Sequence, residues 1–423
     1  MSFLTGLRCI RCDESFSPEP RFDGCPYCAA EAPSNLTPTY DYAEIHRSFQ
    51  KDMLLDRPLN MWRYREFLPA DPVEASTLDE GLTPLLHCPS LGESIGVPRL
   101  YLKDESRNPT GSFKDRLAVT ALAMAKRFGA QTVGVSSTGN AGAAAAAYSA
   151  RQGLPCVVLT VKGAASAMVT QIRAYGAMVV ATEKKEDRWK LLQAGIKQSG
   201  WYPTSPFFGP PIGSNCYGVD GYKTIAYEIC EQLGWRAPYR CVLPVAYGDA
   251  MFGMWKGFVE FAEMGLVSSR PRMIAAETAG SLGAAMRVGL DAVPFRTPPE
   301  HSVAGSINVG QGTYQALQAL RASGGSASTV ENDELLELQA ELASREGIYA
   351  EPSSLAALAA IRRLRADGEI QDNEIIVGLI TATGLKDPEA TASQQEEIPV
   401  VRGDIDELLG TLRETYGYKT EQP

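Results

Sequence analysis

Hydrophobic positions along the chain follow two alternating periods, one typical of helices and one of short buried strands. From residue 116 to residue 183, apolar residues on a helical spacing are interrupted by short runs rich in β-branched residues. The expected order is helix 116–129, strand 132–137, helix 141–153, strand 155–161, helix 167–176, strand 178–182 and a charged helix from Glu183. Short strands separated by helices are typical of parallel α/β sheets with right-handed crossovers.

A second set of the same kind occupies the other half of the chain, and a strand-like segment at 99–105 precedes the first set. The second set is helix 221–234, strand 240–246, helix 253–265, strand 272–277, helix 354–368 and strand 374–380. Residues 201–215 are rich in Pro, Gly and Ser and predict a crossing between two domains. Residues 322–329 predict a flexible loop, and the acidic tail after Pro388 predicts a peripheral segment.

Composition and charge narrow the functional classes. The chain has 423 residues, of which 44% are hydrophobic and 21% charged, which is enough for two or three domains with buried cores. A formal net charge of -10 offers no basic field for a nucleic acid, so none is expected as a partner. No apolar run reaches the roughly 20 residues of a membrane helix, and the N-terminus has no signal-peptide core. We therefore expect a cytoplasmic protein with no membrane partner.

Four cysteines near the N-terminus form two CxxC pairs. Cys9 and Cys12 make the first pair, and Cys25 and Cys28 make the second after a polar stretch. Four thiolates on two tight turns match the tetrahedral geometry of a structural zinc ribbon. Two pairs without metal, in a degenerate ribbon, are the alternative. A redox role is less favoured, because neither pair begins a helix after a strand.

Candidate chemistry gathers in the loops that follow three predicted strands, where α/β folds place their ligands. Ser136 to Gly142 follow the strand at 132–137 and open an alanine-rich helix, which suits an anion such as a carboxylate. Tyr247 to Gly253 follow the strand at 240–246 and suit a phosphate held by backbone amides. Thr381 ends the strand at 374–380. An ordinary helix cap or hydroxyl-capped turn is the simpler explanation of each loop taken alone.

A lysine in an unusual setting completes this set. Lys114 lies in "NPTGSFKDR" (108–116), after a Pro-Gly turn and before an adjacent acid and base. A lysine that must present a neutral amine to an aldehyde needs a rigid turn and a charged partner nearby, whereas a surface lysine needs neither. A reactive lysine, a carboxylate site, a phosphate cradle and a hydroxyl for a pyridine nitrogen together favour pyridoxal phosphate as cofactor.

The sequence resembles the fold-type II pyridoxal-phosphate enzymes, and most closely threonine synthase and its relatives. The motifs that carry the resemblance run from the cysteine pairs through "MWRYREFLP", "LDEGLTPL", "YLKDESRNPTGSFKDR", "SSTGNAGAAAAAYS" and "GYKTIAYEI" to "YAEPSS" and "TGLKDP". This resemblance implies two open parallel-sheet α/β domains with an N-terminal zinc-ribbon-like segment. The expected parts are the ribbon (1–40), an arm with the start of the large cofactor domain (41–110), a small α/β domain (111–214) and the rest of the large domain with its tail (215–423).

The resemblance also implies roles for individual residues and an expected homodimer. Lys114 carries the cofactor as a Schiff base and moves protons between substrate carbons. Gly248, Asp249 and Ala250 belong to the phosphate cradle. The other implied roles are Asn140 at the phenolic oxygen of the cofactor, Thr381 at its pyridine nitrogen, and Ser137, Thr138 and Gly139 at the substrate carboxylate. A neutral hydroxyl at the pyridine nitrogen favours elimination and replacement over transamination.

Three departures from the threonine synthase pattern leave the substrate open. Gly218 and Asn308 stand where the family has an arginine, and Met168 stands where it has a lysine; Ala246 replaces a glycine of the cradle. Without those cations a phosphorylated substrate loses charge-assisted hydrogen bonds of roughly 1.5 to 3 kcal/mol each.

Three functions remain open from the sequence. The first is the conversion of O-phospho-L-homoserine and water to L-threonine and phosphate. The second is β-elimination or β-replacement on an unphosphorylated hydroxy amino acid. The third is a catalytically silent protein that binds a partner through its ribbon, which the intact lysine motif disfavours. Lys162, Lys184 or Lys185 offers a substitute phosphate site, although the run "EKKEDRWK" (183–190) is more typical of a solvated helix face.

Overall fold

The computed structural model describes residues 2–28 and 32–419. It divides the chain into two compact units, residues 1–387 and residues 388–423. The second unit contains the helices α14 (Pro388–Ala392) and α15 (Ile405–Tyr416). Within the part of the chain that is described, no helix combines the length and the apolar character needed to cross a bilayer.

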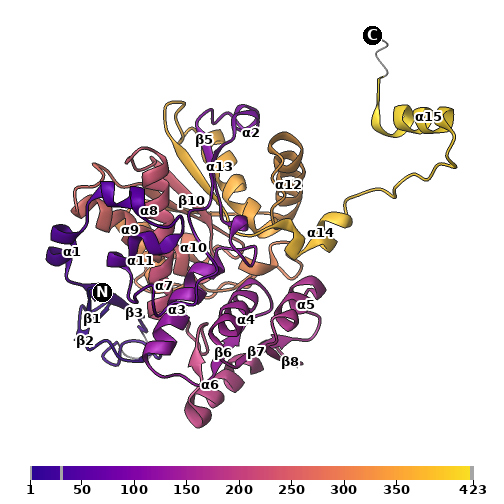
Figure 1. Cartoon of the computed structure of the whole chain (residues 1–423). Helices are drawn as coiled ribbons and strands as arrows, with labels where there is room; N and C mark the ends of the chain where they lie inside the picture. Colours follow the sequence, from indigo (N-terminus) through magenta and orange to yellow (C-terminus); the bar gives the residue numbers. More distant parts are fainter. Residues whose placement is uncertain (1, 29–31, 420–423) are drawn as a thin grey trace. The chain divides into compact units, whose positions relative to one another are not determined.

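The first half of the chain builds a four-stranded sheet. Its order is β8 (Met178–Thr182), β7 (Cys156–Val161), β6 (Val133–Ser136) and β9 (Tyr202–Pro203), and every pairing is parallel. The helices of this region are α3 (Lys114–Arg127), α4 (Asn140–Gln152), α5 (Ser166–Ala174) and α6 (Asp187–Ser199), and α4 to α6 surround the sheet in Figure 1. The alternation of helix and strand predicted for this half is therefore confirmed, except that α6 begins four residues later than expected.

A six-stranded sheet collects strands from both halves of the chain. Its order is β12 (Ser326–Thr329), β11 (Arg272–Glu277), β10 (Arg240–Pro244), β13 (Ile376–Ile380), β5 (Leu100–Asp104) and β4 (Leu85–His87). All neighbours are parallel except β4, which pairs antiparallel with β5. Strand β12 corrects the flexible loop predicted at 322–329: the second half of that segment pairs with β11 in register from Ile274↔Ser326 to Glu277↔Thr329. Pairing with a buried neighbour outweighs the weak strand propensity of Ser and Ala.

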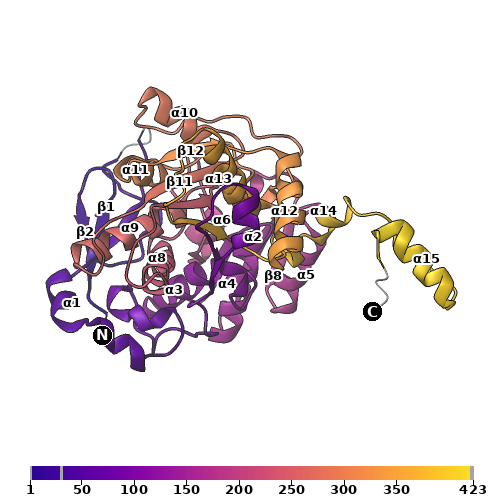
Figure 2. The same cartoon turned by 90° about the horizontal axis from the view of Figure 1, so that it is seen from above.

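Helices cover both faces of this second sheet, as Figure 2 shows from above. They are α2 (Pro89–Ser94), α8 (Lys223–Gln232), α9 (Asp249–Glu263), α10 (Ser281–Val288), α11 (Tyr314–Ala322), α12 (Asn332–Glu346) and α13 (Ala356–Ala366). Two further short helices are α1 (Tyr42–Ser48) and α7 (Cys216–Val219). One core cluster lies among α8, α9 and α11, and another among α2, α12 and α13. The α/β class of the fold is thus confirmed.

The N-terminal segment forms a small antiparallel sheet of its own. Strand β1 (Leu4–Cys9) pairs with β2 (Ser15–Phe16) on one side and with β3 (Leu36–Tyr40) on the other. Leu7 and Leu36 are almost fully buried and join the core cluster that contains α3 and α4. The cysteine-rich segment is therefore packed onto the enzyme body rather than separate from it.

Candidate active site

One cavity, of about 180 Å³, brings together the loops that follow β6, β10 and β13. All nine residues that the sequence predicts for cofactor and substrate line it: Lys114, Ser137, Thr138, Gly139, Asn140, Gly248, Asp249, Ala250 and Thr381. Parallel strands of one sheet end at the same edge, which is why the loops after β10 and β13 meet here. The two sheets supply opposite walls, with 137–140 from the four-stranded sheet and 248–250 and Thr381 from the six-stranded one.

The turn before Lys114 is held by an extensive set of hydrogen bonds. Gly111 has φ +80°, a conformation that glycine adopts without strain, and its N–H donates to the Asn108 carbonyl at 2.8 Å. The Asn108 side chain accepts from the Gly81 N–H at 3.0 Å and donates to Glu105 at 2.9 Å. Phe113 N–H donates to the Thr381 carbonyl at 2.9 Å. These bonds fix the start of α3, and with it Lys114, against the end of β13.

Asp115 and Arg116, the acid and base beside Lys114, do not pair with it. The sequence had suggested that they were its charged partners. Asp115 turns back to the turn and accepts from the Thr110 N–H at 2.7 Å and from the Thr110 hydroxyl. Arg116 is fully buried and binds Glu105 and Glu228 through its guanidinium at 2.6 to 2.8 Å. On a helix, successive residues point in different directions, so neighbours in sequence are not neighbours in space.

Lys114 instead faces the rings of Phe113 and Tyr222, at 4.5 and 5.7 Å from their centroids. Burial lowers the pKa of its ammonium group, and the carboxylates of Asp249 and Glu351 partly oppose that shift. A lowered pKa increases the fraction of neutral amine at neutral pH, and the neutral amine is the form that attacks an aldehyde or accepts a proton. The electrostatic setting of Lys114 therefore comes from residues far away in the sequence.

The loop after β10 lines the cavity and leads into α9. Gly248 has φ +88° and caps α9, and a Cβ added there would lie 2.2 Å from the Cβ of Ala316. The carboxylate of Asp249 is already engaged, because it accepts from Ser214 N–H (2.9 Å), Ser214 Oγ (2.6 Å) and Gln315 Nε2 (2.6 Å). The start of a helix with a glycine at its cap is suited to a phosphate group.

Sequence reasoning missed Glu351. It lies behind the loop at 137–140 that is predicted for the substrate carboxylate, here called the carboxylate loop. It is 2% exposed, accepts from Asn140 Nδ2 at 2.7 Å and also accepts from the Ser306 hydroxyl. Burial raises the pKa of its carboxyl group. The only local signal is the motif "YAEPSS" at 349–354, whose acidic residue precedes a proline. On the other wall, Thr381 Oγ1 lies 2.9 Å from Ser354 Oγ.

The three positions that depart from the threonine synthase pattern add no charge to the cavity. Gly218 lies in α7 against α3, where a Cβ would meet Leu117 and Ala121 at 3.0 Å. Met168 packs on the carboxylate loop, since its sulfur would lie 2.4 Å from a Cβ on Gly139. Asn308 lines the cavity, but its side chain donates to the Pro299 carbonyl at 2.9 Å and accepts from Thr278 Oγ1 at 3.1 Å.

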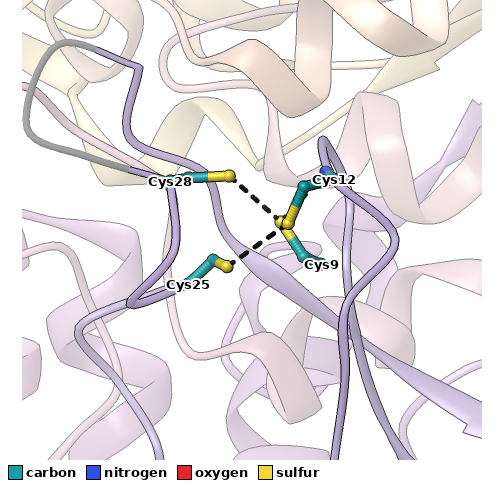
Figure 3. Close-up of side chains that lie close together, drawn as sticks. All are labelled: Cys9, Cys12, Cys25 and Cys28. Atoms are coloured by element: carbon teal, nitrogen blue, oxygen red, sulfur yellow. Dashed lines mark hydrogen bonds between the residues drawn. The ribbon is translucent and has the colours of Figure 1, made fainter.

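The four cysteines of the N-terminal segment also converge. Their sulfur atoms all lie within 4.8 Å of one another, with Cys9 and Cys28 at 3.5 Å and Cys12 and Cys25 at 3.6 Å (Figure 3). The N–H groups of Arg11 and Cys12 donate to the sulfur of Cys9 at 3.3 and 3.4 Å. A tetrahedron of sulfurs at about 2.3 Å from zinc has edges of about 3.8 Å, so this donor set fits a structural zinc ion.

Comparison with known proteins agrees with the fold and the site. The family model described as "Pyridoxal-phosphate dependent enzyme" matches residues 76–382. The chain therefore belongs to the pyridoxal-phosphate-dependent enzymes, its cofactor is pyridoxal phosphate, and it is a lyase of the threonine synthase type. Threonine synthase of Methanocaldococcus jannaschii is 35% identical over 415 residues, which cover 96% of this chain and 99% of the relative. Threonine synthase of Methanosarcina acetivorans is 36% identical over 408 residues, 95% of this chain and 97% of the relative.

Solved structures support the fold at lower sequence identity. Threonine deaminase isoform 2 from Solanum lycopersicum has a TM-score of 0.63 at 19% identity. The match covers 74% of this chain and 87% of the deaminase chain. Maize serine racemase has a TM-score of 0.62 at 18% identity. The match covers 74% of this chain and 91% of the racemase chain. These similarities are evidence for the fold-type II architecture alone.

The residues in the cavity fit the cofactor. Lys114 is free of ion pairs within residues 2–28 and 32–419, and Asn140 Oδ1 is buried with no partner in the same part of the chain. Gly248 and Asp249 line the cavity at the start of α9, and the first N–H groups of a helix are suited to a phosphate. A polar ligand that reaches all three features satisfies groups that the protein leaves unsatisfied.

Proposed function

We propose that this protein is a threonine synthase that converts O-phospho-L-homoserine and water into L-threonine and phosphate. The observation that carries the proposal is the 35% identity to a threonine synthase over nearly the full length of both chains, together with a lysine in the cavity. Pyridoxal phosphate, when bound, withdraws electrons from the substrate carbons and so eases the removal of protons next to the amino group.

In this proposal each residue of the cavity has a separate role. Lys114 holds the cofactor and moves protons at the substrate carbons, with a pKa lowered by burial. Ser137, Thr138 and Gly139 hold the substrate carboxylate, and Ser137 Oγ accepts from the Gly139 N–H at 3.1 Å, which orients the loop. Asn140 binds the phenolic oxygen of the cofactor, and Gly248, Asp249 and Ala250 offer amides to its phosphate. Thr381 presents a neutral hydroxyl to the pyridine nitrogen.

A second function is favoured by one observation: none of the three family cations is present at positions 168, 218 and 308. An enzyme of this type without a phosphate subsite would eliminate or replace a β-substituent of a serine-like or threonine-like substrate and, on elimination, release ammonia and a 2-oxo acid. The substrate of either reaction is a small amino acid.

One assay separates the two functions. Purified, cofactor-loaded enzyme is supplied with O-phospho-L-homoserine, and phosphate and threonine are measured; L-serine and L-threonine are supplied in parallel, and 2-oxo acid is measured. Equal amounts of phosphate and threonine establish the first function. Turnover of the hydroxy amino acids without turnover of the phosphate ester establishes the second.

We also propose that Cys9, Cys12, Cys25 and Cys28 hold a structural zinc ion. The sulfur distances support this, and the segment they close packs on α3 and α4 through Leu7 and Leu36. Elemental analysis is expected to find one zinc per chain, and Cys12→Ser is expected to lower both the zinc content and the melting temperature. Zinc retained in full by this variant would contradict the assignment.

A homodimer and a cytoplasmic location are carried over as proposals from the family resemblance. Light scattering on the purified protein tests the first, and fractionation of the producing cell tests the second. A monomer in solution would contradict the first proposal without affecting the reaction proposed above.

A further inference from the structure

The cavity contains two positive side chains that the cofactor assignment does not use. Arg188, in the first turn of α6, and Lys185, just before that helix, both line the same cavity as Lys114. Arg188 is only 7% exposed, whereas Lys185 is exposed and so lies at the rim of the cavity. The run 183–190 is thus not an entirely solvated face, since two of its basic residues reach the active site.

Arg188 has few partners in the part of the chain that the structure describes. Its Nε donates to the Lys185 carbonyl at 3.2 Å, and no carboxylate within residues 2–28 and 32–419 forms an ion pair with it. The nearby acids are engaged elsewhere or exposed: Glu183 pairs with Lys162, Asp187 pairs with Lys190, and Glu186 is exposed. Burial lowers the pKa of Arg188, and the phenol of Tyr247 and the carboxylate of Glu186 partly oppose that shift. The pKa of Lys185 is lowered by partial burial and then by the Arg188 charge.

A buried cation without a counter-ion is costly, so its retention beside an active site indicates an anionic ligand. Two anions are candidates there, the phosphate of the cofactor and an acidic group of the substrate. The cofactor phosphate has a separate cradle of amides at the start of α9, on the six-stranded sheet. Arg188 lies on α6, which packs on the four-stranded sheet that also provides the carboxylate loop at 137–140. The second anion is therefore the better match for Arg188. Tyr247, next to the cradle, also acts on its charge, so cofactor binding by the variant is part of the test below.

We propose that Arg188, assisted by Lys185, binds the distal phosphate of the amino-acid substrate. This inference rests on the function proposed above and assigns its substrate subsite. The cations that the threonine synthase pattern places at 168, 218 and 308 are absent, and the space at Gly218 is filled by Leu117 and Ala121. In this proposal the phosphate subsite is formed by the start of α6 and the residues just before it. A guanidinium suits this role because it can bind two phosphate oxygens at once.

The test uses two unreactive amino acids of the same carbon skeleton. L-2-amino-5-phosphonopentanoate carries a distal phosphonate that cannot leave, and L-norvaline lacks it. Binding of each to the cofactor-loaded enzyme is followed by the change in the visible spectrum. We expect wild-type enzyme to prefer the phosphonate, and Arg188→Gln to reduce that preference by about 30-fold, the effect of about 2 kcal/mol lost from charge-assisted hydrogen bonds. Lys185→Gln is expected to reduce it by about 3- to 10-fold because that residue is exposed.

Controls separate this role from others. Lys190→Gln removes a charge from the same helix, but its side chain is 76% exposed and pairs with Asp187, so the preference is expected to stay within twofold of wild type. Arg188→Lys keeps the charge but loses the two-pronged geometry of the guanidinium, so it is expected to restore only part of the preference. Melting temperatures of all variants show whether each is folded.

Three outcomes overturn the proposal. Weaker binding of pyridoxal phosphate to the Arg188→Gln apoenzyme, with the ligand preference intact, assigns Arg188 to the cofactor. Unchanged binding of cofactor and both amino acids makes the residue structural. An equal loss for phosphonate and norvaline indicates a general distortion of the cavity.

Failure of this inference is distinguishable from failure of the proposed function. If the enzyme forms no threonine but its preference for the phosphonate still depends on Arg188, the subsite stands and the reaction is a different one on an acidic amino acid. If threonine forms and Arg188→Gln leaves the preference intact, the reaction stands and the subsite assignment is wrong.

Discussion

Two regions present a basic side chain to the active-site cavity, and they are built in opposite ways. Most buried groups around the turn that ends at Lys114 are hydrogen-bonded: Asn108 binds Glu105, Thr110 binds Asp115, and Arg116 binds two carboxylates. The buried hydroxyl of Ser112 is an exception among the described residues. Within the described residues, the guanidinium of Arg188 donates one hydrogen bond, to the Lys185 carbonyl, and forms no ion pair. We interpret the first as the part that fixes the chemistry and the second as the part that selects the substrate.

The largest effect is expected where the chemistry is fixed. Replacing Lys114 with Ala removes both the cofactor linkage and the proton carrier, so activity is expected to fall by about 10³-fold or more. The visible absorbance of the lysine-bound cofactor should disappear at the same time. A variant that keeps this absorbance and a normal melting temperature would contradict the cofactor assignment.

The ion network beneath the lysine turn is expected to dominate stability. Arg116→Met leaves the buried carboxylates of Glu105 and Glu228 without their partner, which is expected to cost about 3 to 5 kcal/mol of unfolding free energy. Urea denaturation measures this change. Arg47→Met is the matched control, since Arg47 is 68% exposed and its solvent-screened pair with Glu44 is expected to contribute little to stability. Equal losses in the two variants would contradict the network's role.

The same turn should make stability depend on pH in a defined direction. Burial raises the pKa of Asp115 from 3.8 to about 7, while Lys386 opposes and Glu80 adds to the shift. The folded state therefore holds this proton more tightly, so the stability it contributes is complete below pH 4 and is lost as the pH rises to about 7.

Comparison with Asp115→Asn isolates this effect, because Asn is neutral at every pH. Relative to the variant, wild-type protein is expected to lose roughly 2 to 4 kcal/mol of unfolding free energy between pH 4 and pH 7.5. Urea denaturation at the two pH values measures the difference. A gap between the two proteins that is the same at both values would show that Asp115 titrates normally.

The smallest effect is expected in the second region, where the sign of the change is informative. Arg188→Met removes a buried cation that lacks a counter-ion, so in the absence of substrate the unfolding free energy is expected to stay within about 1 kcal/mol of wild type or to rise. The measurement is thermal unfolding of the cofactor-loaded protein. A loss as large as that of Arg116→Met would mean that Arg188 is held by the protein and not reserved for a ligand.

The sequence predicted much of this site because the relevant signals are local. A strand followed by small polar residues and a helix marks a ligand loop. Of the two loops predicted in this way, residues 136–141 and 247–251 line the cavity. The alanine-rich helix after the first loop packs with Ala143 and Ala144 fully buried, as close approach requires. Strand β12 was missed because Ser and Ala carry little strand propensity, and its pairing with β11 supplies the structure.

What the sequence by itself determined is the set of parts: an α/β fold, a lysine at a rigid turn, strand-end loops for anions and four cysteines at metal-ligand spacing. Only the tertiary structure decided which charges face one another. Asp115 and Arg116 turn away from Lys114, Asp249 and Glu351 act on it from distant segments, and Arg188 enters the cavity unpaired. The physical reason is that Coulomb interactions and desolvation depend on distance and burial, which sequence separation does not give.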